Sequence, residues 1–266
     1  MLSLAKEAIT LWKSRALVGV LTRRELEARN AGSAGGVLWA YIQPLLTVAA
    51  YYLVFDVVFA MRLGENAPTR AVGAFLIVGS LPWMAFCDAV SRGMNSLLDA
   101  GSVLQKNALP PVLFPVRSVL ASTVIYGPLI ALLTLAYGPQ HGFGAALFSM
   151  VPLLALQLLL CMLIGYLLSI LAAALRDTMQ IVGFLLSVGI FLSPVLFPIT
   201  LFPEQWRWAL WLNPMTGMVI GYQEVLLRGT WPPYSVWLSA GIWLVLTSIV
   251  LSVVVRRSRD QLVDWL

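Results

Sequence analysis

Charged side chains are scarce in this chain of 266 residues. Asp, Glu, Lys and Arg make up only 11% of the sequence, and hydrophobic residues make up 60%. A soluble domain carries about 25% charged residues, so this shortage excludes an ordinary water-soluble fold. It predicts an all-α integral membrane protein that forms a single domain over residues 1–266.

Residues that carry catalytic chemistry are also few. The chain has two cysteines, one histidine and three lysines, and no lysine follows a glycine-rich loop. It therefore lacks the phosphate loop G-x-x-x-x-G-K-[ST], and it lacks the H-E-x-x-H and G-x-S-x-G patterns. Cys87 and Cys161 lie in apolar runs that predict buried thiols, and His141 has no metal-ligand neighbour in the sequence. We expect no catalytic residue, metal site or cofactor in this chain.

Long runs without charge predict six transmembrane helices, because a membrane helix needs about 20 apolar residues. The longest run, residues 118–175, is broken by Gly138, Pro139 and Gly142, which are typical of turns. It therefore holds two spans. Residues 35–196 are expected to contain spans one to five, and residues 234–266 span six with a tail. The expected spans cover residues 35–60, 71–90, 116–137, 146–173, 178–196 and 235–255.

The basic residues are distributed unequally between the two sides of these spans. If the ends and loops alternate sides, one side holds 13 of the 17 Lys and Arg residues, and the other holds Arg62, Arg70, Arg207 and Arg228. Basic loops face the cytoplasm, so both termini are predicted to be cytoplasmic. The net charge of +5 reflects this orientation, and we expect no nucleic-acid partner.

Residues 1–34 are predicted to form a cytoplasmic helix on the membrane surface. Apolar residues recur there at helical spacing, at Leu2, Ala5, Ile9, Trp12 and Ala16. A basic amphipathic helix lies on anionic headgroups. It can act as a simple anchor, as a platform for a cytoplasmic partner or as a guide for headgroups.

Residues 197–233 are too apolar for an exposed loop, and too broken by proline and charge for a simple span. Trp206, Trp208 and Trp211 crowd the first half, and tryptophan concentrates where lipid meets water. Irregular backbone cannot face lipid, so the segment must pack on protein or line a cavity. A full crossing would also place the final arginines on the wrong side. We therefore predict a re-entrant helix pair that forms an outer gate.

Two further sets of residues lie at membrane depth and suggest different functions. The carboxylates Asp56, Asp88 and Glu224 are candidates for an ion- or proton-coupled carrier, although each lies near a span end. Aromatic rings along the spans could instead line a path for sugars, because sugar faces stack on aromatic platforms much as bases do. Such rings also commonly pack in the bundle or face lipid. The candidates are Tyr51, Tyr52, Trp83, Phe86, Tyr126 and Phe191.

Three motifs follow one another along the chain. The first motif opens span one and consists of Arg29, Gly32, Ser33, Gly36, Leu38, Trp39, Pro44 and Leu45. The second is the Arg176 and Asp177 pair with Leu-Ser-Pro-Val at residues 192–195, and the third is Trp-Leu-Asn-Pro-Met at residues 211–215. In order and spacing these motifs resemble those of ABC-2-type permeases that export bacterial cell-surface polysaccharides such as O-antigen, capsule and teichoic acid.

This resemblance implies a permease subunit of the bacterial inner membrane and not an enzyme. Two copies would form the channel, and two copies of a separate ATPase subunit would bind ATP and Mg²⁺. The family's ATPase contact lies between spans two and three, here at Asp99, Gln105, Lys106, Asn107 and Leu109. The outer gate would include Trp206, Trp208, Trp211 and Asn213.

The family's substrate is a long glycan on a phosphate-bearing lipid anchor. The resemblance therefore implies a lipid-linked polysaccharide and membrane lipids as partners, with Arg23, Arg24 and Arg29 as a guide for the lipid phosphate. Three alternatives stay open. They are an ABC exporter of a small lipid or drug, the ion-coupled carrier, and a membrane enzyme of glycan assembly, which the missing catalytic residues disfavour.

Overall fold

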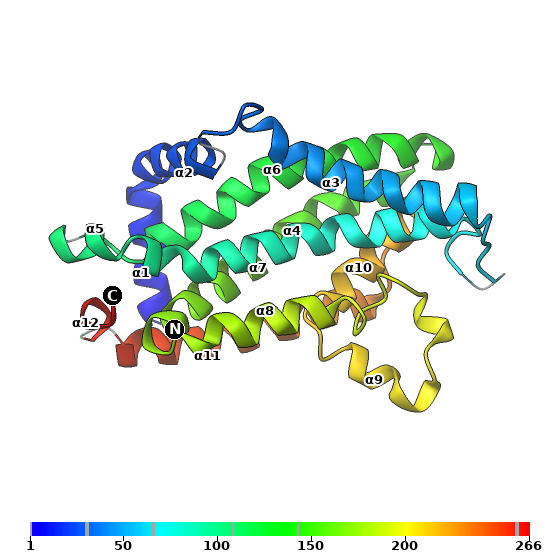
Figure 1. Ribbon diagram of the computed structural model, residues 1–266. Helices are drawn as coiled ribbons and strands as arrows, with labels where there is room; N and C mark the ends of the chain where they lie inside the picture. The colour runs from blue at the N-terminus through cyan, green and yellow to red at the C-terminus, as the bar shows by residue number, and fades with distance from the viewer. Residues whose placement is uncertain (1, 30–31, 65–66, 108, 143, 259–260) are drawn as a thin grey trace.

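A computed structural model of the protein describes residues 2–29, 32–64, 67–107, 109–142, 144–258 and 261–266. Its regular elements are helices, and the one β-bridge among the described residues pairs Arg62 with Ala71. The expected all-α class is therefore confirmed. Both ends of the chain lie at the same end of the helix bundle (Figure 1).

Within the described residues, five helices are long and apolar enough to cross a membrane, and they run side by side in Figure 1. They correspond to the expected spans one to four and six. Helix α4 continues past the expected end of span two, at residue 90, because its helical pattern persists to Asp99. The five are α3 (Leu38–Tyr51, prolonged by the π-helical turn η1, Tyr52–Val58), α4 (Val72–Asp99), α6 (Leu113–Tyr137), α7 (Met150–Ala174) and α11 (Tyr234–Ser258).

The fifth expected span, residues 178–196, is shorter in the structure. Helix α8 covers only Asp177–Gly189, about 20 Å at 1.5 Å per residue, which is less than the roughly 30 Å of a hydrocarbon core. Pro194 weakens a continuation of the helix, because it has no N–H for the Ile190 carbonyl. The Ser193 hydroxyl approaches that oxygen at 3.4 Å instead. In the described part of the chain, five long helices and one short helix are therefore present where six full spans were expected.

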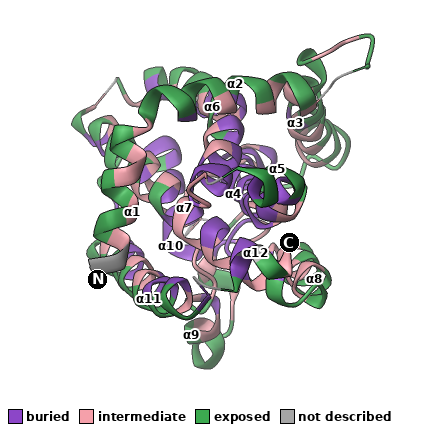
Figure 2. Cartoon of the chain, turned by 90° about the vertical axis from the view of Figure 1, so that its left-hand side faces the viewer, coloured by how far each residue is buried: buried purple, intermediate pink, exposed green. Residues whose placement is uncertain are grey.

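Short helices gather at both ends of the bundle (Figure 1). The end with the termini carries α1 (Leu2–Lys13), α2 (Arg15–Arg29), α5 (Gly101–Lys106) and α12 (Leu262–Trp265). Helices α1 and α2 meet at an angle (Figure 2). The structure therefore has two helices, the second of which ends at Arg29, where a single surface helix was expected over residues 1–34. The opposite end carries η2 (Gly138–His141), η3 (Ala145–Ser149), η4 (Ile199–Leu201), η5 (Glu204–Trp206), α9 (Arg207–Leu210), α10 (Thr216–Gln223) and η6 (Glu224–Arg228).

Helix α4 forms the centre of the molecule, whereas α3 lies on its outside (Figure 2). In the most apolar stretch of each span, 72% of the residues are buried for α4 and only 6% for α3 with η1. Helix α4 packs against α6, α7 and α10. A Cβ atom on Gly93 would lie 2.9 Å from the Cα of Gly165, so the backbones of α4 and α7 touch, as small residues allow in membrane helix pairs.

We expect Gly93→Ala to destabilise the protein by about 1–3 kcal/mol, because the new methyl group must push α4 and α7 apart. The matched control is Gly127→Ala in α6, where an added Cβ would meet no atom within 4 Å and alanine favours the helix. Thermal unfolding of both variants in detergent measures the difference. Equal unfolding temperatures would show that this close contact does not hold the bundle.

Candidate functional site

Helix α4 leads into a projecting segment made of α5 and the residues that follow it. The chain turns at Ala100, whose carbonyl accepts hydrogen bonds from the next turn at 2.9 Å. Leu104 is buried and anchors the segment to the bundle. The expected ATPase-contact residues lie together here: Asp99, Gln105, Lys106 and Asn107 are exposed, and Leu109 is half-buried.

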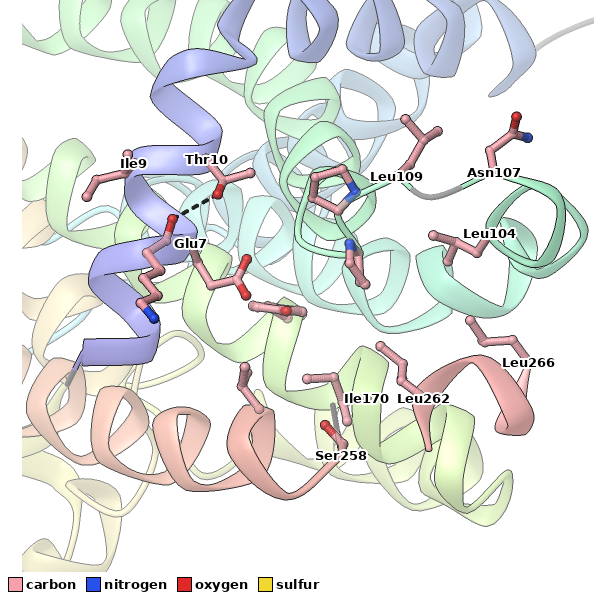
Figure 3. Close-up of a pocket in the computed structure, with 15 residues that line it drawn as sticks. Glu7, Ile9, Thr10, Leu104, Asn107, Leu109, Ile170, Ser258, Leu262 and Leu266 are labelled. Carbon is pink, nitrogen blue, oxygen red and sulfur yellow. Dashed lines mark hydrogen bonds between the residues drawn. The ribbon is translucent and has the colours of Figure 1, made fainter. Parts of the chain in front are cut away.

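A cavity of about 680 Å³ lies beside this segment (Figure 3). Its walls come from Glu7 and Thr10 of α1, from Leu104 and Asn107, and from the ends of α7, α11 and α12. The cavity therefore joins the N-terminal helix, the segment after α4 and the C-terminal residues in one surface. An open, largely apolar hollow beside exposed polar side chains is a surface on which another protein can dock.

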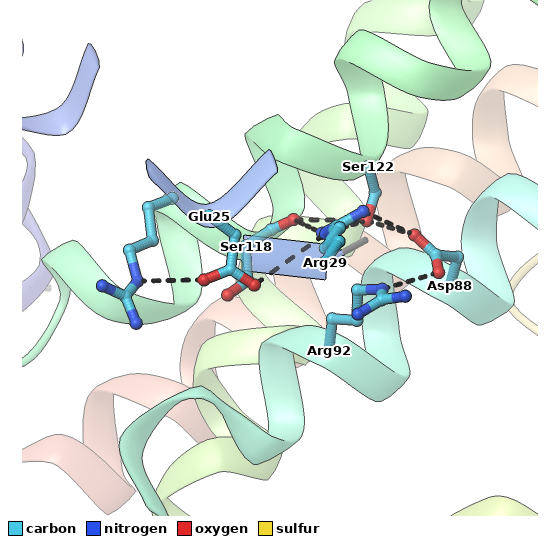
Figure 4. Close-up of polar contacts among 7 residues, drawn as sticks. Glu25, Arg29, Asp88, Arg92, Ser118 and Ser122 are labelled. Carbon is cyan, nitrogen blue, oxygen red and sulfur yellow. Dashed lines mark hydrogen bonds and ion pairs between the residues drawn. The ribbon is translucent and has the colours of Figure 1, made fainter. Parts of the chain in front are cut away.

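Arg29 is placed differently from the role expected of it. Its side chain is only 3% exposed, and it donates to Asp88 Oδ2 at 3.2 Å and to the Ser118 carbonyl at 2.9 Å (Figure 4). It also donates to the Ser122 hydroxyl at 3.1 Å, which in turn donates to Asp88 at 2.5 Å. These bonds engage the guanidinium with α4 and α6, so Arg29 is not presented to a lipid phosphate as the sequence suggested.

Further charges surround this contact (Figure 4). Arg92 Nε lies 2.9 Å from Asp88 Oδ1, and the Glu25 carboxylate lies 3.9 Å from Arg29 Nε and 3.6 Å from Arg117 Nε. Burial lowers the pKa of Arg29, and the charge of Asp88 opposes that shift. Because an arginine stays protonated in proteins, the network is a set of ion pairs that ties α2 to α4 and α6.

The other two expected guide residues are accessible. The Arg23 side chain is 83% exposed, and its Nε lies 3.0 Å from Glu27 one turn along the helix. Arg24 is also exposed on α2. An exposed pair of this kind contributes at most about 1 kcal/mol, so Glu27 leaves Arg23 free to reorient towards another anion.

The three carboxylates considered for a carrier each have an arginine partner. Asp56 Oδ1 lies 3.8 Å from Arg62, and Glu224 Oε1 lies 2.8 Å from Arg228. Asp88 is engaged as described above. No group of three His, Cys, Asp or Glu that could hold a metal occurs in the described ranges. The carboxylates are thus placed as separate ion pairs on different elements, which disfavours a relay between them.

The six aromatic residues considered for a sugar path are not brought together within one protomer. Trp83 and Phe86 are buried on α4 with ring centroids 5.8 Å apart. They line an apolar cavity of about 410 Å³ between α4, α7 and α8. Of the others, Tyr52 and Phe191 are exposed, and Tyr51 and Tyr126 are half-buried. These six residues therefore do not form a continuous aromatic path within the chain.

Two short helical segments occupy the region expected for the helix pair, residues 197–233. The first contains η5 and α9, and the second contains α10 and η6. Trp206 and Trp208 are exposed on the first segment, with ring centroids 6.5 Å apart. Trp211 is half-buried, and its carbonyl accepts a hydrogen bond from Trp243 of α11 at 3.3 Å. The tryptophans thus divide into an exposed pair and one packed residue.

Asn213 joins α8 to α10. Its amide nitrogen donates to the Gly189 carbonyl at 3.0 Å and to the Leu192 carbonyl at 3.3 Å. Its side-chain oxygen accepts from the Met215 N–H at 3.0 Å. A single side chain therefore satisfies backbone groups at the end of α8 and before the start of α10, which gives Asn213 a structural role in the outer segment.

The sequence reasoning missed a buried polar bridge between α4, α7 and α10. Gln157 of α7 donates to the Pro82 carbonyl at 2.9 Å and accepts from the Tyr222 hydroxyl at 2.7 Å. The next residue, Gln223, donates to the Pro194 carbonyl at 2.8 Å. A glutamine inside an apolar run was the available signal, because a buried amide needs partners.

The sequence matches the ABC-2 type transporter family over residues 16–227, which extends from α2 into η6. The chain belongs to this ABC-2 type transporter family. It is 33% identical to the O-antigen export system permease protein RfbA of Myxococcus xanthus over 227 residues, 84% of each chain. Membership of a transporter family and several apolar helices make this ABC-2 chain a multi-pass membrane protein.

Two more distant relatives also align over most of their length. The RfbA permease of Klebsiella pneumoniae is 25% identical over 218 residues, 80% of this chain and 81% of its own. The polysialic acid transport protein KpsM of Escherichia coli is 22% identical over 253 residues, 92% of this chain and 93% of its own. The likeness therefore covers the transmembrane bundle and is not limited to one motif.

We expect Arg29→Gln to destabilise the protein by about 1.5–3 kcal/mol, because it removes charged hydrogen bonds from Asp88, Ser118 and Ser122, although Arg92 still pairs with Asp88. Arg23→Gln is the control, since it removes an exposed pair and should cost less than about 1 kcal/mol. Thermal unfolding in detergent compares the two. If both variants unfold at the same temperature, the network around Asp88 does not hold α2 in place.

Proposed function

We propose that this ABC-2 chain is a permease subunit of an ATP-driven exporter that moves lipid-linked cell-surface polysaccharide across the bacterial inner membrane. The observation that carries the proposal is the family match, with relatives named for O-antigen export and polysialic acid transport aligned over most of both chains. The geometry supports it, because the buried helix α4 connects an exposed segment at one end to the centre of the bundle.

The energy for transport would come from a separate ATPase subunit that binds ATP and Mg²⁺. We propose that this subunit contacts the segment at Asp99, Gln105, Lys106, Asn107 and Leu109. The segment projects from the end of α4, and its polar side chains are exposed while Leu104 holds it to the bundle. The neighbouring 680 Å³ cavity offers apolar walls to a side chain of the partner.

A second copy of the chain would complete the channel, with two ATPase subunits below the pair. Helix α3 is one candidate for the contact, because it is apolar and nearly unburied in the protomer. Helix α8 also exposes Ile181, Phe184 and Leu185. Pairing these faces would allow aromatic residues of both copies to border one path, and membrane lipids would cover the remaining apolar surface.

The end of the bundle with both termini would face the cytoplasm, since it carries most of the basic residues. Helices α1 and α2 would then lie on the inner surface, where Arg23 and Arg24 can meet the phosphate of the lipid anchor. The segments η5–α9 and α10–η6 would form the re-entrant gate at the outer mouth, with Trp206 and Trp208 next to the passing sugar chain.

The ATPase contact is tested by changing Gln105→Ala together with Lys106→Ala. We expect the amount of ATPase subunit that copurifies with the chain to fall at least about tenfold, because a combined loss of about 1.4 kcal/mol from the two contact residues already weakens binding tenfold. Gln140→Ala, which is exposed at the opposite end, is the control and should copurify normally. Unchanged copurification of the double variant would exclude this segment as the contact.

The gate is tested by changing Trp206→Ala together with Trp208→Ala. Removing both rings should raise ion leak through reconstituted vesicles several-fold or reduce export, since these side chains would no longer close the outer mouth. Phe148→Ala removes an even more exposed ring at the same end of the bundle and should do neither. A leak and an export rate that both match the unchanged protein would contradict the gate assignment.

A further inference from the structure

A groove of about 790 Å³ lies between the helix pair α1–α2 and the first turns of α6. Figure 2 shows α1 and α2 on the outside of the bundle, with α6 next to α2. Val18 and Thr22 are buried residues of α2 that line the groove, and Leu120 and Val124 of α6 contribute to its wall. The groove belongs to the end of the molecule that carries both termini.

The walls of this groove suit hydrocarbon better than water. Its two threonine hydroxyls are already bonded within their own helices, Thr22 to the Val18 carbonyl at 2.8 Å and Thr123 to the Val119 carbonyl at 2.9 Å. Most other lining residues are aliphatic. Apolar space of this kind does not hold water well, because water there would lack hydrogen-bond partners. In a bilayer, a lipid acyl chain is available to occupy this groove.

The lining of the groove also carries positive charge without any acidic residue. Arg15 lies over the Trp12 ring, 5.5 Å from its centroid, and donates to the Trp12 carbonyl at 3.3 Å. Arg23 is highly exposed, and only its Nε donates a hydrogen bond to Glu27. A guanidinium has five N–H donors, so both arginines retain donors for another ligand. The polar end of that ligand should therefore be an anion with several oxygens, such as a phosphate.

We propose that this groove binds one anionic phospholipid of the bilayer, with an acyl chain along α6 and its phosphate at Arg15. Basic pockets beside membrane helices on the cytoplasmic side bind such headgroups. The bound lipid holds α1–α2 against α6. This inference requires membrane embedding and does not depend on the transported substrate.

Native mass spectrometry of the full-length protein, with added phosphatidylglycerol or phosphatidylcholine, tests the headgroup contact. We expect one phosphatidylglycerol to be retained at a concentration about tenfold lower than phosphatidylcholine, because each basic residue favours the anionic lipid. Arg15→Gln should weaken phosphatidylglycerol binding about fivefold. Lys13→Gln, an exposed basic residue that does not line the groove, is the matched control and should leave binding unchanged.

Gly19→Leu tests the acyl-chain contact. Gly19 lines the groove, and a Cβ added there would meet no atom within 4 Å. A leucine can therefore occupy the space without a clash, and it should weaken phosphatidylglycerol binding at least about tenfold by excluding the chain. Gly241→Leu on α11 is the matched control, since its added Cβ also meets no atom within 4 Å.

Three results would overturn the proposal. The first is equal retention of the two phospholipids by the unchanged protein, and the second is undiminished phosphatidylglycerol binding by both Arg15→Gln and Gly19→Leu. Displacement of phosphatidylglycerol by a lower concentration of a polyprenyl pyrophosphate would assign the groove to the transported lipid and would also overturn it. If Gly19→Leu does not fold, the surface variant Arg15→Gln decides alone.

Discussion

The backbone contact between α4 and α7 is the constraint on which the rest of the bundle depends. A Cβ on Gly93 would lie 2.9 Å from the Cα of Gly165, so only glycine permits this approach. The contact lets α4 sit inside the protomer, covered by α6, α7 and α10, and leaves α3 on the outside.

Polar side chains fix the position of the helices that are too short to span the membrane. Because the hydrocarbon core contains no water, each buried polar group must find a partner inside the protein. Gln157 and Tyr222 join α7 to α4 and α10, and Asn213 satisfies the backbone at the end of the short helix α8. At the other end, Arg29 and Asp88 tie α2 to α4. These contacts explain how α8 and α10 stay in place although neither is long enough to span.

The sequence predicts the long helices well, because the length of an apolar run is a local property. It also locates the exposed segment after α4 and the short helices of residues 197–233. It does not predict the end of α8, which depends on Pro194 and on a side chain from residue 213. Nor does it predict that Arg29 is buried or that Trp83 and Phe86 line an apolar cavity between helices, since burial depends on which helices become neighbours. The sequence shows Gln157 only as an amide in an apolar run, and it does not predict the partners of Gln157 on two other helices.

Reconstitution of the chain into vesicles, with and without its ATPase subunit, tests the central claim most directly. The measured quantity is transfer of a lipid-linked oligosaccharide across the membrane, with Mg-ATP supplied or with an ion gradient imposed. We expect transfer only when the ATPase subunit and Mg-ATP are both present. Transfer by the chain alone under an ion gradient would contradict it and would identify a carrier instead.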